Sequence, residues 1–228
     1  MNELAQFKSE PRVFRRKARG NGMGIDTRYM KPPKCLEIPG RMLKYEYAQD
    51  LANDIEIQKG SRHFVIISGN FIAGDFIEAL IVKNNWHVKN LTISTLSLSQ
   101  GNIDSLVNLA NGNFTDQINI IVSDYFFAHE RNGLVKYAYE HLDKNDAFQL
   151  AAAGSHCKIA TIETYCGFKI TIHGSANLRS SGNTEQFQVE ENSELYAFNQ
   201  EIFTSIIDKY KTINKSVRRK ELWQAVQK

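Results

Sequence analysis

The sequence contains few cysteines, the residues whose disulfide bonds stabilise small secreted domains. Among 228 residues there are three cysteines, Cys35, Cys157 and Cys166, and this odd, sparse set lacks the spacing of a disulfide framework. No two of them lie as close as the paired ligands of a zinc knuckle, so no structural metal is expected. The pattern favours a reducing compartment, and we expect a cytoplasmic protein.

Long hydrophobic segments are also missing. An apolar run such as residues 64–67 is far shorter than the roughly 20 residues that cross a bilayer. The N-terminus has no apolar stretch of the kind found in signal peptides. We therefore expect a soluble, intracellular protein without a membrane partner.

Charge is modest overall but unevenly distributed. The net charge is +3, and basic residues crowd both ends of the chain. They are Arg12, Arg15, Arg16, Lys17 and Arg19, and then Lys209, Lys211, Lys215, Arg218, Arg219 and Lys220. Such blocks either bind nucleic acid through its phosphates or are simply solvated ends, and the sequence leaves both interpretations open. We expect a basic arm at 1–40, one domain at 41–212 and a basic tail at 213–228.

Within the expected domain the apolar pattern changes regularly between strands and helices. Continuous β-branched runs predict buried strands, and apolar residues at helical spacing predict helices. The expected strands are 63–68, 88–96, 118–122, 148–152, 158–164 and 169–173, and the expected helices are 45–58, 75–84, 103–110, 134–142 and 193–211. Asn102 is expected to cap the third helix. This order predicts an α/β fold with a mixed, mostly parallel sheet flanked by helices.

The chemistry-bearing residues lie between 155 and 190. His156 and Lys158 are two apart in an expected strand, so both side chains project from one face. An ammonium group beside an imidazole favours the neutral, nucleophilic imidazole. On the returning strand Ser175 and Asn177 offer a hydroxyl and an amide, and Gly174 is expected to let a ligand approach the backbone. Together these groups suit in-line attack on a phosphodiester.

The same residues resemble a known motif. His156-Cys-Lys158 followed by Gly174-Ser-Ala-Asn177 is similar to the HKD motif of the phospholipase D superfamily, which runs His-x-Lys, four residues, Asp, six residues, Gly-Ser-x-Asn. Asn183-Thr-Glu185 resembles the Asn-x-Glu that often follows. Glu163 stands where the family usually has Asp, and ten residues instead of six separate it from Gly174. The even-numbered insertion preserves the alternation of faces along the strand.

This resemblance implies a phospholipase D-like fold and a two-step phosphodiester cleavage that uses no metal and no cofactor. One histidine forms a phosphohistidine, and a second one, from another HKD half, protonates the leaving oxygen. The chain contains one half-motif and no internal repeat, so the resemblance implies a homodimer that pairs two half-sites. The expected catalytic residues are His156, Lys158, Ser175, Asn177 and Glu185, with Glu185 orienting a histidine.

Several other histidines and Cys157 are expected to have structural roles. His173 is expected to be a hydrogen-bonded histidine on the opposite face of its strand from Gly174, although a place in the site stays open. Cys157 is expected to point into the core. The remaining histidines, which have no partner pattern, are expected to be surface or hydrogen-bonded structural residues: His63, His87, His129 and His141.

The size of the chain and its single motif most resemble the small bacterial endonuclease branch of the family. The expected substrate is therefore nucleic acid, with DNA favoured, and the expected enzyme is a homodimeric nuclease. Two alternatives remain: a non-catalytic nucleic-acid-binding module that keeps the phosphate pocket, and a scaffold within a larger assembly.

Overall fold

The structure is a computed structural model that describes residues 41–45, 47–68, 71–144, 146–179 and 183–212. The predicted basic arm and basic tail lie outside these residues. The strands are β1 (Arg41–Tyr45), β2 (Arg62–Ile67), β3 (Val88–Thr95), β4 (Ile118–Ser123), β5 (Phe148–Ala153), β6 (Ile159–Thr164), β7 (Lys169–Gly174) and β8 (Glu185–Glu191). The helices are α1 (Ala48–Asp54), α2 (Ala73–Lys83), α3 (Gln100–Asn111), α4 (Asp124–Glu130), α5 (Leu134–Leu142) and α6 (Ser193–Tyr210).

All eight strands form one mixed sheet in the order β1-β2-β8-β7-β6-β3-β4-β5. The expected α/β class and mixed sheet are confirmed. Six of the eight strands run in one direction, and β6 and β8 run against them. Three of the seven neighbouring pairs are parallel and four are antiparallel, because β6, β7 and β8 lie between β2 and β3 and separate the parallel strands.

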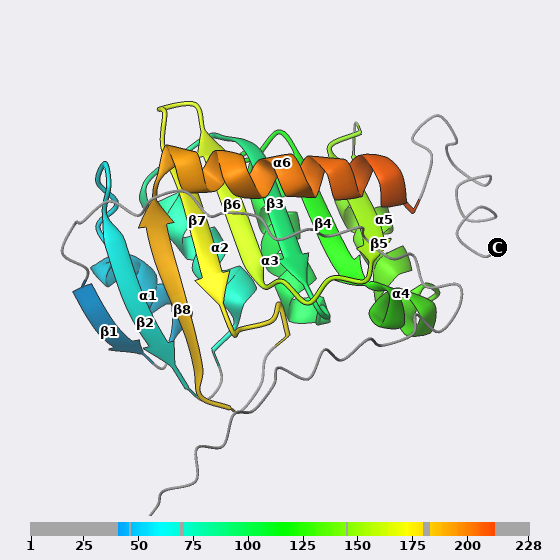
Figure 1. Cartoon of the computed structure of the whole chain (residues 1–228), viewed down its shortest axis with the longest axis horizontal. Coiled ribbons are helices and arrows are strands. Elements are labelled where there is room, and N and C mark those ends of the chain that lie inside the picture. The colour runs from blue at the N-terminus through cyan, green and yellow to red at the C-terminus, as the bar shows by residue number, and fades with distance from the viewer. Residues whose placement is uncertain (1–40, 46, 69–70, 145, 180–182, 213–228) are drawn as a thin grey trace, which may run out of the picture.

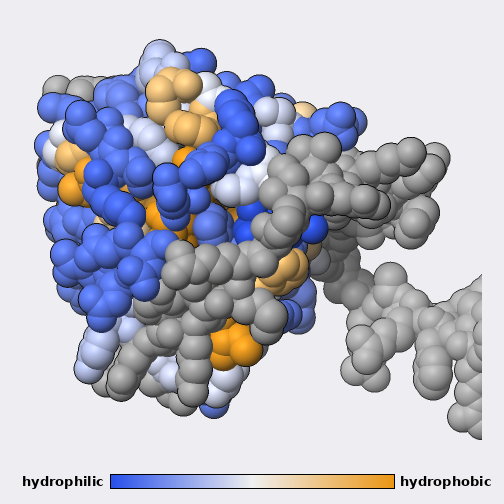
Figure 2. Space-filling model, turned by 90° about the vertical axis from the view of Figure 1, so that its left-hand side faces the viewer, coloured by the Kyte–Doolittle hydropathy of each residue, from blue (hydrophilic) through white to orange (hydrophobic). Residues whose placement is uncertain are grey.

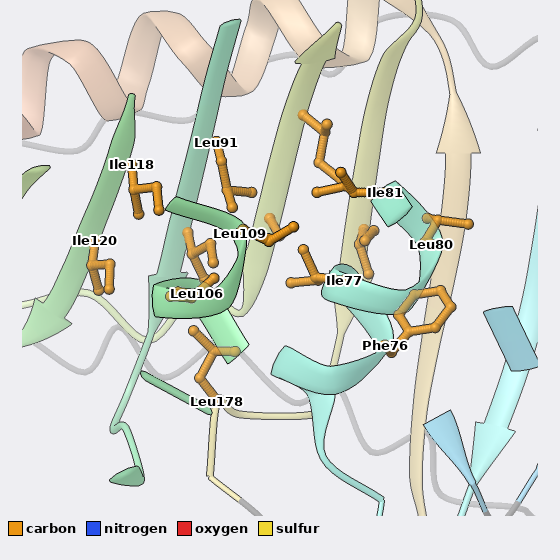
Figure 3. Packing of buried hydrophobic residues seen from close by; sticks show 14 of the residues in the cluster. Phe76, Ile77, Leu80, Ile81, Leu91, Leu106, Leu109, Ile118, Ile120 and Leu178 are labelled. Atoms are coloured by element: carbon orange, nitrogen blue, oxygen red, sulfur yellow. The ribbon is translucent and has the colours of Figure 1, made fainter. Parts of the chain in front are cut away.

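The sheet is the middle of three layers (Figure 1). Helices α1, α2, α3 and α5 cover one face with an apolar core, whereas α6 crosses the other face over β3 to β7. Figure 3 shows how the side chains of α2 and α3 reach the strands behind them. The residues labelled there are Phe76, Ile77, Leu80 and Ile81 of α2, Leu106 and Leu109 of α3, Leu91, Ile118 and Ile120 of the strands, and Leu178.

Strands β4 and β5 are buried on both faces, which explains their nearly continuous apolar sequences. Under α6 they carry Ile121, Ala151 and Ala153, which pack against Phe203 of the helix. The central strands instead present threonines to α6, and the Gln200 Nε2 of that helix donates a hydrogen bond of 2.9 Å to the Thr161 hydroxyl. The helix is therefore held by apolar contacts at one end and by hydrogen bonds further along.

Three elements were not expected: β1, α4 and β8. The sequence of β8 is largely polar, yet Glu190 and Glu191 in it are both 3% exposed. Arg62 of β2 donates two hydrogen bonds to the Glu190 carboxylate, from Nε at 2.9 Å and Nη2 at 2.8 Å. Lys59 donates to Glu191 at 2.9 Å. Buried carboxylates need such partners, and those partners lie more than 125 residues away in the sequence.

The predicted cap of the third helix is also wrong. Ser99 is the residue that precedes α3, and Asn102 lies inside the helix, fully buried. Its Oδ1 accepts a hydrogen bond of 2.7 Å from the Gly74 N–H, and its Nδ2 donates to the Ser99 hydroxyl at 2.8 Å. Asn102 therefore joins the start of α2 to the start of α3.

None of the helices in the described ranges is long and apolar enough to cross a membrane. Seen from the β1 edge of the sheet, the coloured surface is mainly hydrophilic, with hydrophobic residues in small separate patches (Figure 2).

Candidate active site

The five motif residues come together at one edge of the sheet. The carboxyl ends of β2, β3, β4, β5 and β7 lie at this edge, the lower one in Figure 1, and β6 and β8 begin there. His156 and Lys158 directly precede β6, Ser175 and Asn177 directly follow β7, and Glu185 opens β8. In α/β sheets ligands commonly bind at the carboxyl ends of the strands.

His156 lies in the connection between β5 and β6, three residues before β6 begins and outside the strand in which it was expected, and it is exposed. The buried Ser155 fixes this connection: its hydroxyl pairs with the Ser94 hydroxyl at 3.3 Å and accepts a hydrogen bond of 3.2 Å from the Cys157 N–H. Cys157 is itself exposed and free of any disulfide. The expected core position of Cys157 is therefore wrong, because it precedes the strand instead of lying in it.

Lys158 connects the two halves of the motif. Its Nζ donates a hydrogen bond of 3.2 Å to the carbonyl of His156, and its own carbonyl accepts one of 3.2 Å from the Gly174 N–H. A Cβ at Gly174 would meet Phe187 Cα at 2.5 Å and Phe187 Cβ at 2.6 Å. The close approach of β8 therefore requires a glycine at this position, and the expectation that Gly174 lets a ligand approach the backbone stays a prediction.

Hydrogen bonds join Ser175 to β8. Its N–H donates to the Gln186 carbonyl at 2.8 Å, and its hydroxyl accepts from the Gln186 N–H at 3.0 Å. The same hydroxyl donates a hydrogen bond to the Glu185 carboxylate. The Ser175 hydroxyl can therefore donate to a phosphate only after it leaves Glu185. Orientation of a histidine by Glu185 stays a prediction.

Asn177 is held by the end of β3. Its Oδ1 accepts a hydrogen bond of 3.3 Å from the Leu96 N–H. The next residue, Leu178, donates its N–H to the Thr95 hydroxyl at 3.0 Å and accepts from the Ser99 N–H at 2.9 Å. The amide oxygen is committed to the backbone, whereas the Asn177 Nδ2 has no acceptor among the described residues and can donate to a ligand.

A cleft of about 680 Å³ opens beside His156, within the usual size range of small-molecule sites. Arg179, which the sequence reasoning did not single out, also lines it. Its guanidinium is exposed and pairs with no carboxylate in the described ranges. Arg179 also lines a small neighbouring pocket with Asn177 and Glu185. Its position two residues after Asn177 was the signal that could have identified it.

The other wall of the cleft is α4, which the sequence analysis did not predict. Tyr125, His129 and Glu130 of this helix line the cleft. Ser123 fixes α4 to β3, since its hydroxyl accepts from the Phe126 N–H at 3.1 Å and donates to the Leu96 carbonyl at 2.8 Å. The backbone of Leu96 therefore links α4 with Asn177.

Two candidates lie away from this constellation. Glu163 is near the far end of β6, where its carboxylate accepts from the Tyr196 hydroxyl at 3.1 Å. His173 shares the face of the sheet with Glu190, opposite to Gly174, as expected. Its Nε2, however, is buried without a hydrogen-bond partner in the described part of the chain, so the expected hydrogen bond is not found there. Burial lowers the pKa of the His173 imidazole, and the positive charge of Arg62 adds to this while Glu190 opposes it.

The remaining histidines are hydrogen-bonded, as expected. His63 pairs with a backbone carbonyl, His87 pairs with Asp116 at 2.6 Å, and both His129 and His141 bond the carbonyl four residues earlier. Among the described side chains there is no group of three or more His, Cys, Asp or Glu residues arranged to hold a metal ion.

No family model matches the chain, and no curated protein matches it. Among solved structures it is similar to Nuc from Salmonella typhimurium, a phospholipase D family member, with a TM-score of 0.45 and 14% identity over 65% of this chain and 96% of that chain. It is also similar to NucT from Helicobacter pylori, with a TM-score of 0.46 and 13% identity over 66% of this chain and 98% of that chain. A third is phosphatidylserine synthase from Haemophilus influenzae Rd KW20, with a TM-score of 0.46 and 13% identity over 78% of this chain and 48% of that chain. All three similarities have TM-scores below 0.5 and identities below 15%, so the proposed activity rests on the residues of the site itself.

Proposed function

We propose that the chain is a metal-independent phosphodiesterase, a nuclease that acts through a phosphohistidine, with one half-site in each subunit of a homodimer. The observation that carries the proposal is the placement of His156. His156 is exposed and lines the cleft together with Arg179, whose guanidinium pairs with no carboxylate in the described ranges, and the ammonium group of Lys158 hydrogen-bonds the His156 carbonyl. A nucleophile bordered by cationic donors is what an anionic phosphodiester requires.

The first step forms a bond between the His156 nitrogen and phosphorus and breaks the bond from phosphorus to the leaving oxygen. Lys158, the Asn177 amide and Arg179 would hold the non-bridging oxygens. The leaving oxygen takes a proton from the His156 of the second copy, which then removes a proton from water. That water attacks phosphorus and releases His156. The chain carries one such motif, and a twofold axis supplies the other.

Nucleic acid is the proposed substrate class for two reasons. Arg179 lines both the cleft and the pocket of Asn177 and so extends the cationic surface along the edge of the sheet. The segment 1–40 contains nine Lys and Arg residues and four Asp and Glu residues, a net +5 that would attract a polyanion.

The test is incubation of the purified chain with plasmid and single-stranded DNA in EDTA, beside His156→Ala and His87→Ala. His87 provides the matched control, because it is a half-exposed histidine at the opposite edge of the sheet. We expect cleavage by the native chain and by His87→Ala, and none by His156→Ala, which should still retard DNA in a gel. Retardation without cleavage by any of the three would indicate a binding module instead, and dependence on a divalent cation would reject the mechanism.

The dimer has its own test. Light scattering at micromolar concentration should give twice the chain mass of 26.0 kDa. A monomer that still cleaves DNA would remove the paired half-sites from the mechanism while leaving His156 as its nucleophile.

A further inference from the structure

Tyr125 is a large aromatic side chain left open at the mouth of the cleft. It is 75% exposed, the highest value among the exposed large hydrophobic residues of the described ranges. It lies in the first turn of α4, on the wall that faces the cleft shared by His156 and Arg179. Its hydroxyl has no hydrogen-bond partner among the described residues. Aromatic rings left exposed in a cleft are typical of surfaces that bind a planar ligand.

The Tyr125 ring is held in place on one side. It stacks on His129, one helical turn later, with ring centroids 4.1 Å apart and planes inclined by 35°. The His129 Nδ1–H donates a hydrogen bond of 2.7 Å to the Tyr125 carbonyl, which fixes the imidazole. One face of the tyrosine ring is therefore covered by His129, and the high exposure leaves the other face free.

A second tyrosine–histidine pair shows the same stacking with a tyrosine ring that is not left open to solvent. Tyr137 and His141 of α5 form the same pair, with centroids 4.0 Å apart and a hydrogen bond of 2.8 Å from His141 Nδ1–H to the Tyr137 carbonyl. There the tyrosine is half-buried against the core, and its hydroxyl donates to Asp104 at 2.6 Å. The Tyr137 ring is used by the fold, whereas the Tyr125 ring is not.

We propose that Tyr125 is the stacking platform for an unpaired base of the substrate, so that the cleft takes single-stranded nucleic acid. This inference rests on the proposed function and specifies its substrate. A base on Tyr125 would place its neighbouring phosphate at the part of the cleft where Arg179 and His156 lie. Bases inside a duplex already have both faces stacked, so a duplex cannot use this platform.

The test measures binding without turnover, in a His156→Ala background. A fluorescently labelled oligothymidine is titrated by anisotropy with the parent, Tyr125→Phe, Tyr125→Ala and Tyr165→Ala. Tyr165 is the matched control, because it is 60% exposed but lies in the turn between β6 and β7, at the other end of those strands. Tyr125→Ala should weaken binding roughly tenfold or more, as loss of one base–aromatic stack does, while the phenylalanine and the control variant bind like the parent. Equal binding by Tyr125→Ala would overturn the proposal.

An oligonucleotide of abasic sites separates stacking from charge. Its affinity should be the same with and without the Tyr125 ring, and an equal loss with this ligand would show that Tyr125 acts on the backbone instead. The proposed function fails separately, if the native chain hydrolyses neither DNA nor methyl p-nitrophenyl phosphate, a phosphodiester that has no base. In that case a loss of oligothymidine binding in Tyr125→Ala would still support the stacking platform.

Discussion

Replacement of Gly174 by alanine tests the geometry that places the two halves of the site side by side. The added Cβ would lie 2.5 Å from Phe187 Cα and 2.6 Å from Phe187 Cβ. One of these is a backbone atom and the other is the first side-chain carbon of Phe187 in β8. Neither can move by rotation of the side chain, so the strand itself must shift. Overpacking of this kind costs about 1–3 kcal/mol, and we expect about 3 kcal/mol because the pairing of β7 with β8 is strained as well.

The matched control is Gly101→Ala. A Cβ there would have Ile72 Cδ1 as its nearest neighbour, at 4.0 Å, within the first turn of α3. Alanine at such a position should stabilise the fold by about 0.5 kcal/mol. Urea denaturation followed by circular dichroism gives both free energies of unfolding. If Gly174→Ala were as stable as the native chain, β8 would not lie where the structure places it, and the bond between Ser175 and Glu185 would lose its support.

Three further results are expected. Burial by itself raises the pKa of Glu190, but hydrogen bonds from Arg62 and Asn192 lower it overall. Arg62→Met should therefore cost about 3–5 kcal/mol at pH 7. The cost should be smaller near pH 4, because the buried carboxyl of the variant has lost its guanidinium partner and is neutralised by a proton there; equal costs at both pH values would contradict this assignment. Because the pKa of His173 is lowered in the folded chain, the unfolded chain binds more protons than the folded chain below about pH 6.5. The free energy of unfolding should therefore fall from pH 7 to pH 5, and it should fall less steeply in His173→Gln. An equally steep fall in the variant would reject this linkage. Removal of residues 1–20 should weaken DNA binding and reduce its dependence on salt, because the arm is expected to contact phosphates; unchanged binding and salt dependence would contradict this.

The strands whose sequences are continuous apolar runs were predictable, whereas β8 was not. Burial on both faces selects apolar residues directly, so β4 and β5 could be located to within one residue. In β8 the buried carboxylates of Glu190 and Glu191 make the segment look like a polar loop. Only the fold shows that Arg62 and Lys59 neutralise them, because no local pattern reveals a partner so distant in the sequence.

The candidate site was likewise predictable from the sequence only in part. The spacing of His156, Lys158, Ser175 and Asn177 gave their common edge of the sheet, since residues at the ends of adjacent antiparallel strands must meet. One wall of the cleft beside His156 is α4, which carries Tyr125 and is held in place by the hydrogen bonds of Ser123. A wall contributed by a short helix without a motif of its own cannot be inferred from local spacing.

The central claim, that His156 is the nucleophile, is tested most directly by trapping the covalent intermediate. The native chain is mixed with ³²P-labelled single-stranded DNA in EDTA, quenched in alkaline detergent and digested for mass spectrometry. Our account predicts a phosphoramidate on His156 that is stable to base and labile to acid, and no labelled protein from His156→Ala. Cleavage without any labelled protein, or with the label on another residue, would contradict it.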